Sequence, residues 1–347
     1  MVISKDVGGV DEHRVRAAID VLSSEADVQV CNTAMPGELD GALHRRGGRT
    51  LVVAGGDRNL HRVVSALHRR NELADTLLAV LPDGSPDDFV AGAGIPSDPL
   101  QAARVVLQGV ERRFDLIEDC RGSVILNVVR LGRCRTTRAA GWFGNGRGGS
   151  LYGYTMAGFG RGDAAPPAAY GSSKPFHVRI EADSTVVADF DRPVTSVALV
   201  NAPSRLPSAV GPLAALSFSA FPFATTSPIL GRDDSRRRGA AARRAALLAP
   251  SADPTDHLID VVVRFAVSPY RRLLTWLRRT HPIARDDVVT IRARQVKIVG
   301  QRFWMTCDGQ DAGTEQRCTW TVLPKSLRLI VPRDSHVPDA MTAVSAH

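Results

Sequence analysis

Alternating apolar and amphipathic segments in the first third of the chain limit its fold more than any other feature. Two short apolar runs end in glycine-rich turns, TLVVAGG at 50–56 and LLAVLPDG at 77–84. Segments 12–24, 61–70 and 98–110 have apolar residues at three- and four-residue spacing, which predicts helices. Strands and helices in this alternation build a parallel sheet with helices on both faces. The sequence therefore predicts a doubly wound α/β domain, with ligands bound at the glycine-rich turns that follow the strands.

After about residue 120 the pattern changes to short runs of β type, separated by Gly, Pro and Asp. The runs lie at 123–129, 176–183, 195–201, 258–267, 289–300, 303–309 and 327–332. This spacing is typical of an antiparallel sandwich or barrel. The chain has 347 residues, more than a single core usually supports. We therefore expect an α/β lobe at 1–122, a β-rich lobe at 123–331 and a tail at 332–347.

The chain is basic, with a formal net charge of +8 and a pI near 9.7. Such a charge suits nucleic acid or an anionic membrane surface. Only four of the 44 basic residues are lysines, which indicates a general arginine bias. No basic and aromatic pattern of the kind that stacks bases occurs, so we expect no nucleic-acid partner. The arginine-rich segment 232–250 is predicted to be a solvated insertion or, alternatively, a patch facing anionic lipid headgroups.

Cysteine usage and the start of the chain bear on its compartment. The five cysteines have no C-x-x-C pair or zinc-ligand spacing, and the first residues lack a secretory pattern. We expect reduced thiols in a soluble cytoplasmic protein, with any membrane contact peripheral on the inner face. The charge-free run 209–230 contains three prolines, so it is expected to form strand and loop, lining an apolar pocket, rather than span a membrane. A homodimer is left open.

Two loops carry the residues that point to chemistry. The first is GGD at 55–57 and the second is LPDGSPDDF at 81–89. Backbone amides at a tight turn before a helix bind phosphate, although a glycine pair at this place is often only a turn. Together the loops resemble the catalytic domain of the diacylglycerol kinase family, whose loops read G-G-D-G-T and P-L-G-T-G-N-D-F-A. Sphingosine kinases and, more remotely, NAD kinases are related to that family.

The resemblance extends over about residues 35 to 332, in the order and spacing of the family. The further matching segments are FDL at 114–116, Asn127 with Gly132, SADPTDHLIDVVV at 251–263, FWMTCDGQ at 303–310 and VLPKSLRLIVP at 322–332. The resemblance implies a two-lobed lipid-kinase and NAD-kinase-like fold. Its nucleotide lobe is doubly wound, its second lobe is a β-sandwich, and its active site lies in the cleft.

The resemblance also implies ATP and Mg²⁺ as cofactors, and roles for particular residues. The nucleotide would be held by Gly55, Gly56, Asp57, Arg58, Asn59, Gly84, Ser85 and Asp88. Asp57, Asp88 and Asp115 would surround the catalytic metal and its waters, and Asp308 would be the general base for the acceptor hydroxyl. Asp253, Asp256 and the carbonyl of Leu258 match a structural metal site seen in some members.

Each of these residues also has a plain structural interpretation. An aspartate beside glycine suits a turn or a helix cap, and only the linked set favours catalysis. Asn127 and Asn201 are expected at strand ends, where they satisfy backbone groups. His61 and His257 are assigned no role, because isolated histidines usually lie at the surface or serve packing.

The chain departs from the family pattern at the nucleotide loops and at two further positions. The replacements are Arg58 and Asn59 for Gly and Thr, Asp83 for an apolar residue, Pro86 and Asp87 for Gly and Asn, His257 for Gly, and Gln310 for Glu. If residue 58 needs a positive φ, arginine there costs about 1 kcal/mol and crowds a phosphate. Alternatively, its guanidinium binds the phosphate. Pro86 removes one amide donor, so we expect weakened nucleotide binding.

The favoured function is an ATP-dependent lipid kinase, a phosphotransferase that acts on a diacylglycerol-like lipid hydroxyl in phospholipid metabolism. The alternative is a catalytically degenerate member that binds a lipid or nucleotide and has a regulatory role.

Overall fold

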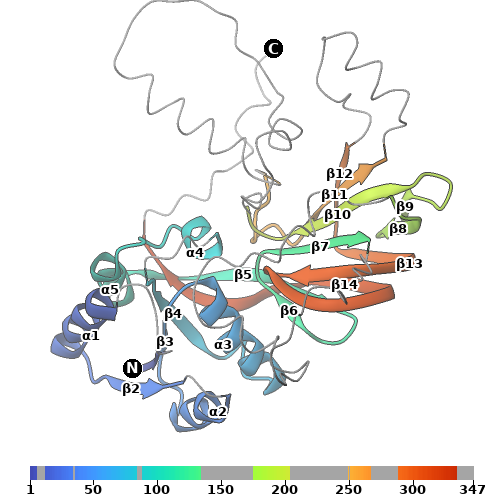
Figure 1. Ribbon diagram of the computed structural model, residues 1–347. Helices are drawn as coiled ribbons and strands as arrows, with labels where there is room; N and C mark the ends of the chain where they lie inside the picture. Colours follow the sequence, from blue (N-terminus) through green and yellow to red (C-terminus); the bar gives the residue numbers. More distant parts are fainter. Residues whose placement is uncertain are drawn as a thin grey trace, which may run out of the picture.

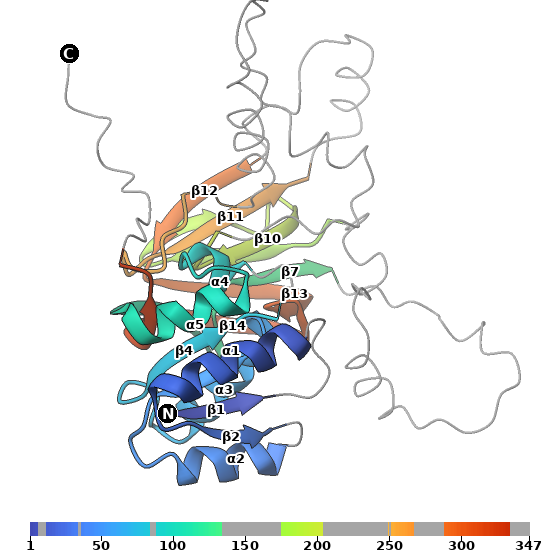
Figure 2. The ribbon, with the colours of Figure 1, turned by 90° about the vertical axis from the view of Figure 1, so that its left-hand side faces the viewer.

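The computed structural model describes residues 1–5, 12–33, 36–83, 88–133, 175–203, 249, 251–266 and 288–333. Within these ranges the strands form one 14-stranded sheet that runs through both halves of the molecule (Figure 1). Helices cover its parallel half. Figure 2 shows this parallel half at one end of the molecule and an antiparallel half at the other.

The first lobe is built on four parallel strands in the order β2-β1-β3-β4. They are β1 (Val2–Lys5), β2 (Gln29–Asn32), β3 (Leu51–Ala54) and β4 (Leu77–Leu81). The helices are α1 (Glu12–Glu25), α2 (Pro36–Arg45), α3 (Asp57–Arg69), α4 (Phe89–Gly92) and α5 (Pro99–Gln108). Helix α1 packs against α5, and α2 against α3. Every residue of β3 is buried, as an apolar strand between helical layers requires. The predicted α/β fold is confirmed.

The second lobe is antiparallel, with the order β12-β11-β10-β7-β13-β14. Strand β8 pairs with β13 and with β9. The remaining strands of the sheet are β5 (Val110–Asp119), β6 (Val124–Ile125), β7 (Val128–Arg133), β8 (Val178–Ala182), β9 (Thr185–Ala188), β10 (Val194–Val200), β11 (Ile259–Phe265), β12 (Val288–Ala293), β13 (Gln295–Cys307) and β14 (Gln310–Val331).

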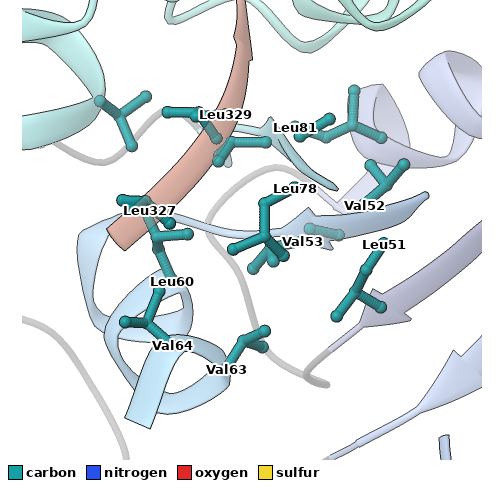
Figure 3. Close-up of a cluster of buried hydrophobic side chains, with 14 of the residues drawn as sticks. Leu51, Val52, Val53, Leu60, Val63, Val64, Leu78, Leu81, Leu327 and Leu329 are labelled. Atoms are coloured by element: carbon teal, nitrogen blue, oxygen red, sulfur yellow. The ribbon is translucent and has the colours of Figure 1, made fainter. Parts of the chain in front are cut away.

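Strand β14 is 22 residues long and belongs to both lobes. Its first half, from Gln310 to Thr321, pairs with β13, and its second half pairs with β5. Arg328 and Leu329 also pair in parallel with β4. Leu327 and Leu329 are fully buried among side chains of β3, α3 and β4 (Figure 3). The last strand thus returns to the first lobe, although the expected division placed it entirely in the second.

Two of the cysteines are not the reduced thiols that the sequence predicts. Cys120 at the end of β5 and Cys318 in β14 form a disulfide, with their Cα atoms 5.5 Å apart. Cys31 and Cys307 are free and buried, and Cys134 lies outside the described residues. Burial, with the charges of Asp308 and Asp119, raises the pKa of Cys307 to about 12, so this thiol is not ionised at neutral pH. The sequence missed the disulfide because its partners are 198 residues apart and meet only through the pairing of β5 with β14.

None of the helices that the structure describes is long and apolar enough to cross a membrane. Several predictions fall outside the described residues: those for Gly84 and Ser85, the apolar run 209–230, and the segment 232–248 with residue 250. They stay predictions.

Candidate active site

The first loop turns from β3 into α3 within two residues. Gly55 has a φ of +131°, and a Cβ at this position would collide with the side chain of Asn59. Gly56 is the N-cap of α3, which begins at Asp57. The Asn59 side chain donates a hydrogen bond from Nδ2 to the carbonyl oxygen of Ala54 at 3.2 Å. The turn therefore requires glycine at 55, and Asn59 closes it.

Arg58 lies in the first turn of α3 with its side chain exposed. It is not among the residues with positive φ, so the backbone strain considered from the sequence does not arise. The helix starts four residues before the predicted segment 61–70, because its first turn is not apolar. An exposed guanidinium at a helix N-terminus is placed to meet an anion.

Asp57 fixes the second loop to the first. Its carboxylate accepts hydrogen bonds from the backbone N–H groups of Asp88, Phe89 and Val90, at 2.9, 2.8 and 3.0 Å. These groups belong to the start of α4, which has no side-chain cap of its own. The aspartate that resembles a nucleotide ligand is thus also a helix cap, and it holds Asp88 next to the first loop.

Asp308 lies in the turn between β13 and β14, with a φ of +48°. Its Oδ1 accepts the N–H groups of Asn127 and Val128, at 2.8 and 2.9 Å. Its Oδ2 accepts the N–H of Leu126 and lies 2.8 Å from Nδ1 of His61. Only 6% of this side chain is exposed, so the carboxylate is held by four N–H groups in a nearly closed site.

The electrostatics of Asp308 follow from these contacts. Burial by itself raises the pKa of the carboxyl group, because water no longer stabilises its charge. The hydrogen bond from His61, the charge of that ring when it is protonated, and the backbone N–H groups of Leu126 and Val128 outweigh burial and hold the pKa below its ordinary value. Asp308 is therefore ionised at neutral pH.

Asn127 joins Asp57 to Asp308, and so joins the two lobes. Its side chain donates from Nδ2 to Oδ2 of Asp57 at 2.9 Å, while its backbone N–H donates to Asp308. His61 follows Asp57 by four residues on α3, so both side chains lie on one face of that helix. We call Asp57, His61, Asn127 and Asp308 the bridging network.

Asp115 belongs to a second buried cluster. One of its oxygens accepts the backbone N–H of His257 at 2.7 Å and the other that of Lys325 at 2.8 Å. The ring Nδ1 of His257 lies 2.9 Å from the same carboxylate. His257 and Lys325 have φ values of +63° and +51°, so Asp115 stabilises two left-handed residues. Asn201 donates to the carbonyl oxygens of Asp115 and Leu126, which is the backbone role expected for it.

In the segment expected to hold a structural metal, one oxygen of each aspartate accepts local hydrogen bonds. Oδ1 of Asp253 accepts the N–H and hydroxyl of Thr255, at 3.0 and 2.7 Å. Oδ1 of Asp256 accepts the N–H of Leu258 at 3.0 Å. In the part of the chain that the structure describes, no group of three or more His, Cys, Asp or Glu side chains could hold a metal ion.

Arg292 supplies positive charge beside this segment. It lies 3.4 Å from Oδ2 of Asp256 and 3.3 Å from Oδ1 of Asp260. Burial raises the pKa of Asp256 and of Asp260, and Arg292 opposes that rise. Oδ2 of Asp256 is buried and has no hydrogen-bond partner among the described residues, and the structural metal site expected here stays a prediction.

Sequence reasoning missed the two histidines that contact the buried aspartates. His61 contacts Asp308 and His257 contacts Asp115, although both were set aside as isolated residues. A signal for His61 was its place four residues after Asp57, at the start of the helix predicted at 61–70. For His257 the signal was that it stands where the family pattern has glycine, since histidine is enriched among non-glycine residues with positive φ.

Comparison with known proteins finds one matching domain in each lobe. Residues 4–118 match the diacylglycerol kinase catalytic domain, and residues 242–331 match the YegS C-terminal NAD kinase beta sandwich-like domain. Together the matches span more than half of the chain and include Asp57, Asp115 and Asp308. The chain contains a diacylglycerol kinase catalytic domain. Its resemblance to the diacylglycerol kinase family is confirmed, with the bridging network joining the two matched domains.

Curated relatives match this chain in shorter segments. A "Probable lipid kinase YegS-like" protein of Stenotrophomonas maltophilia (strain K279a) is 42% identical over 69 residues, 19% of this chain and 22% of the relative. A protein of the same name from Klebsiella pneumoniae (strain 342) is 29% identical over 136 residues, 37% of this chain and 45% of the relative. The chain thus aligns with less than half of the length of each.

Solved structures support the fold. A diacylglycerol kinase structure from Bacillus anthracis str. Sterne has a TM-score of 0.57 and 14% identity, with 96% of each chain covered. A second structure from the same organism has a TM-score of 0.59 and 16% identity, also with 96% of each chain covered. At these identities the likeness concerns the fold alone, and it confirms the two-lobed architecture.

Proposed function

We propose that this lipid kinase family member transfers the γ-phosphoryl group of ATP to the hydroxyl of a diacylglycerol-like lipid. The supporting observation is the bridging network, which runs from the second loop through Asp57 and Asn127 to Asp308. Phosphoryl transfer is catalysed mainly by positioning and charge neutralisation. A continuous path between the nucleotide loops and the β13–β14 turn would hold donor and acceptor at fixed positions.

The proposed nucleotide site uses the N-terminus of α3. Its first-turn amides and the exposed Arg58 would bind the phosphates of ATP. Asp57 and Asp115 already accept N–H groups, so they are not arranged as direct Mg²⁺ ligands. Mg²⁺ usually keeps water and phosphate oxygens as ligands, which suits an ion carried mainly by ATP. When bound, it would neutralise phosphate charge.

A lipid acceptor makes contact with a membrane surface part of the proposal. The arginine-rich segment 232–250 is the candidate for that contact, at the inner face of a membrane. Binding through exposed arginines would weaken as salt rises.

The function is tested by incubating the purified protein with labelled ATP, Mg²⁺ and a panel of lipid alcohols. We expect one lipid class to become labelled, and the label to be absent with the Asp308→Asn variant. If no lipid is labelled and calorimetry detects no ATP binding, the chain is not a lipid kinase.

A second candidate function is binding without catalysis. It is favoured by one observation, the saturation of the Asp57 and Asp308 carboxylates by N–H groups, because such carboxylates suit a structural role. In that case the protein would bind a lipid or nucleotide and regulate another activity. ATP or lipid binding without any phosphorylated product would support it.

Replacing Arg58 with alanine tests whether its side chain binds a phosphate of ATP or obstructs the first loop. We expect the Kd for ATP to rise about tenfold, because a hydrogen bond to a charged group contributes about 1.5–3 kcal/mol. Calorimetry measures the change, and Arg69→Ala is the matched control, since Arg69 is exposed at the other end of α3. Tighter ATP binding by Arg58→Ala would mean that the arginine obstructs the loop.

A further inference from the structure

A histidine and an aspartate from different lobes meet in the bridging network. His61 comes from α3 and Asp308 from the β13–β14 turn, and Nδ1 and Oδ2 lie 2.8 Å apart. The two side chains are 17% and 6% exposed, respectively. The carboxylate is therefore nearly closed off, while part of the imidazole ring is accessible.

Asp308 has little capacity left to accept a further proton donor. An ionised carboxylate offers about four acceptor positions, and four N–H groups already bind this one. The same contacts hold its pKa below the ordinary value, against the effect of burial. Low basicity and filled acceptor positions both make Asp308 a weak base toward an incoming hydroxyl.

The same contacts determine how His61 is protonated. An ionised carboxylate can only accept, so Nδ1 of a neutral His61 carries the hydrogen and Nε2 carries the lone pair. Among the described residues, Nε2 has no hydrogen-bond partner. A carboxylate that fixes the tautomer of an imidazole also stabilises the imidazolium that forms when the ring takes a proton.

We propose that His61, through Nε2, is the general base that activates the acceptor hydroxyl, and that Asp308 is its positioning residue. The inference rests on the proposed kinase function. It differs from the role expected by resemblance, in which Asp308 itself takes the proton.

The proposed step balances as follows. The hydroxyl O–H bond breaks and its proton moves to Nε2, while the oxygen forms a bond to the γ-phosphorus of ATP. The bond from that phosphorus to the oxygen bridging it to the β-phosphate breaks, and ADP leaves with that electron pair. The imidazolium then donates its extra proton to water, and the Nδ1–H group of His61 stays hydrogen-bonded to Asp308.

The decisive variant is His61→Asn, because its side-chain amide can still donate to Asp308 but cannot take a proton. If Nε2 is the base, we expect kcat to fall about 10²- to 10⁴-fold with the KM for ATP unchanged. His68→Asn is the matched control, since His68 lies on the same helix and contacts Glu118 at 2.9 Å outside the network. The control should keep kcat within about twofold. A similarly mild effect of His61→Asn would show that His61 only orients Asp308, and would overturn the inference.

Chemical rescue gives an independent readout. Added imidazole should restore part of the kcat of His61→Ala, but not of His61→Ala combined with Asp308→Asn, because nothing then orients the added ring. Rescue of both variants would contradict the positioning role of Asp308. Rescue of neither variant would contradict the role of Nε2 as the base. The wild-type protein tests the proposed function separately. If it phosphorylates none of the lipids, both proposals are overturned.

Discussion

Replacing Asp308 with asparagine is expected to lower the free energy of unfolding by about 3 kcal/mol, because buried N–H groups lose their acceptor. Four N–H groups meet this carboxylate, and an amide has one oxygen and adds its own donors. Asparagine tolerates the φ of +48° as well as aspartate does, so the backbone should not be strained. Urea denaturation measures the loss.

The same variant has a defined pH dependence. The pKa of Asp308 is lowered on folding, so its ionisation stabilises the folded state at pH values above its pKa in the unfolded chain. That unfolded value is about 3.9. The difference in stability between wild type and Asp308→Asn should be full at neutral pH and should shrink as pH falls through the folded pKa. A difference that grows toward acid pH would contradict the assignment.

Asp311→Asn is the matched control for this prediction. Asp311 lies three residues further along the chain, at the start of β14, is exposed, and accepts hydrogen bonds from Trp304 and Gly313. Because water can replace these contacts, the control should lose less than about 1 kcal/mol. Equal losses of unfolding free energy in both variants would show that any substitution in the β13–β14 hairpin is destabilising, whether or not it removes a contact of the bridging network.

Replacing Asp57 with asparagine is expected to release the start of α4 from the first loop. Backbone N–H groups of Asp88, Phe89 and Val90 share this carboxylate, as does the side chain of Asn127. Loss of one helix cap costs about 0.5–2 kcal/mol, and this carboxylate also joins the lobes. We expect about 2–3 kcal/mol lower stability and at least about tenfold weaker ATP binding.

Hydrogen exchange measures the local effect of Asp57→Asn directly. The amides of Asp88, Phe89 and Val90 should exchange faster, while those of the buried strand β3 should not change at low denaturant. Asp98→Asn is the control, because Asp98 caps α5 through a single exposed contact to Gln101 at 3.3 Å. Unchanged exchange at α4 in Asp57→Asn would mean that the cap does not hold the loop.

Local pattern predicted three helices and two strands of the first lobe. The helix predicted at 61–70 became α3, and the apolar run at 50–56 contains β3. The start of α3 was misplaced because its first turn, Asp57 to Asn59, is polar and does not show the apolar period. That error had a functional consequence, since it left open a strained loop at Arg58 where the structure has a regular helix.

Contacts distant in the sequence were not predictable in the same way. His61 and Asp308 are 247 residues apart, and Cys120 and Cys318 are 198 apart. Neither pair has a local signal, because tertiary folding alone brings α3 to the β13–β14 turn and the end of β5 to β14.

By itself, the sequence determined the α/β and β-rich halves and the two glycine-rich loops, because hydrophobic period and turn chemistry depend on near neighbours. The tertiary structure alone decided what the acidic residues do. A buried carboxylate takes the N–H groups that the fold brings to it, and here those groups come from both lobes. Asp57 and Asp308 thereby became parts of one network, and His61, with no role assigned from the sequence, became its proposed base.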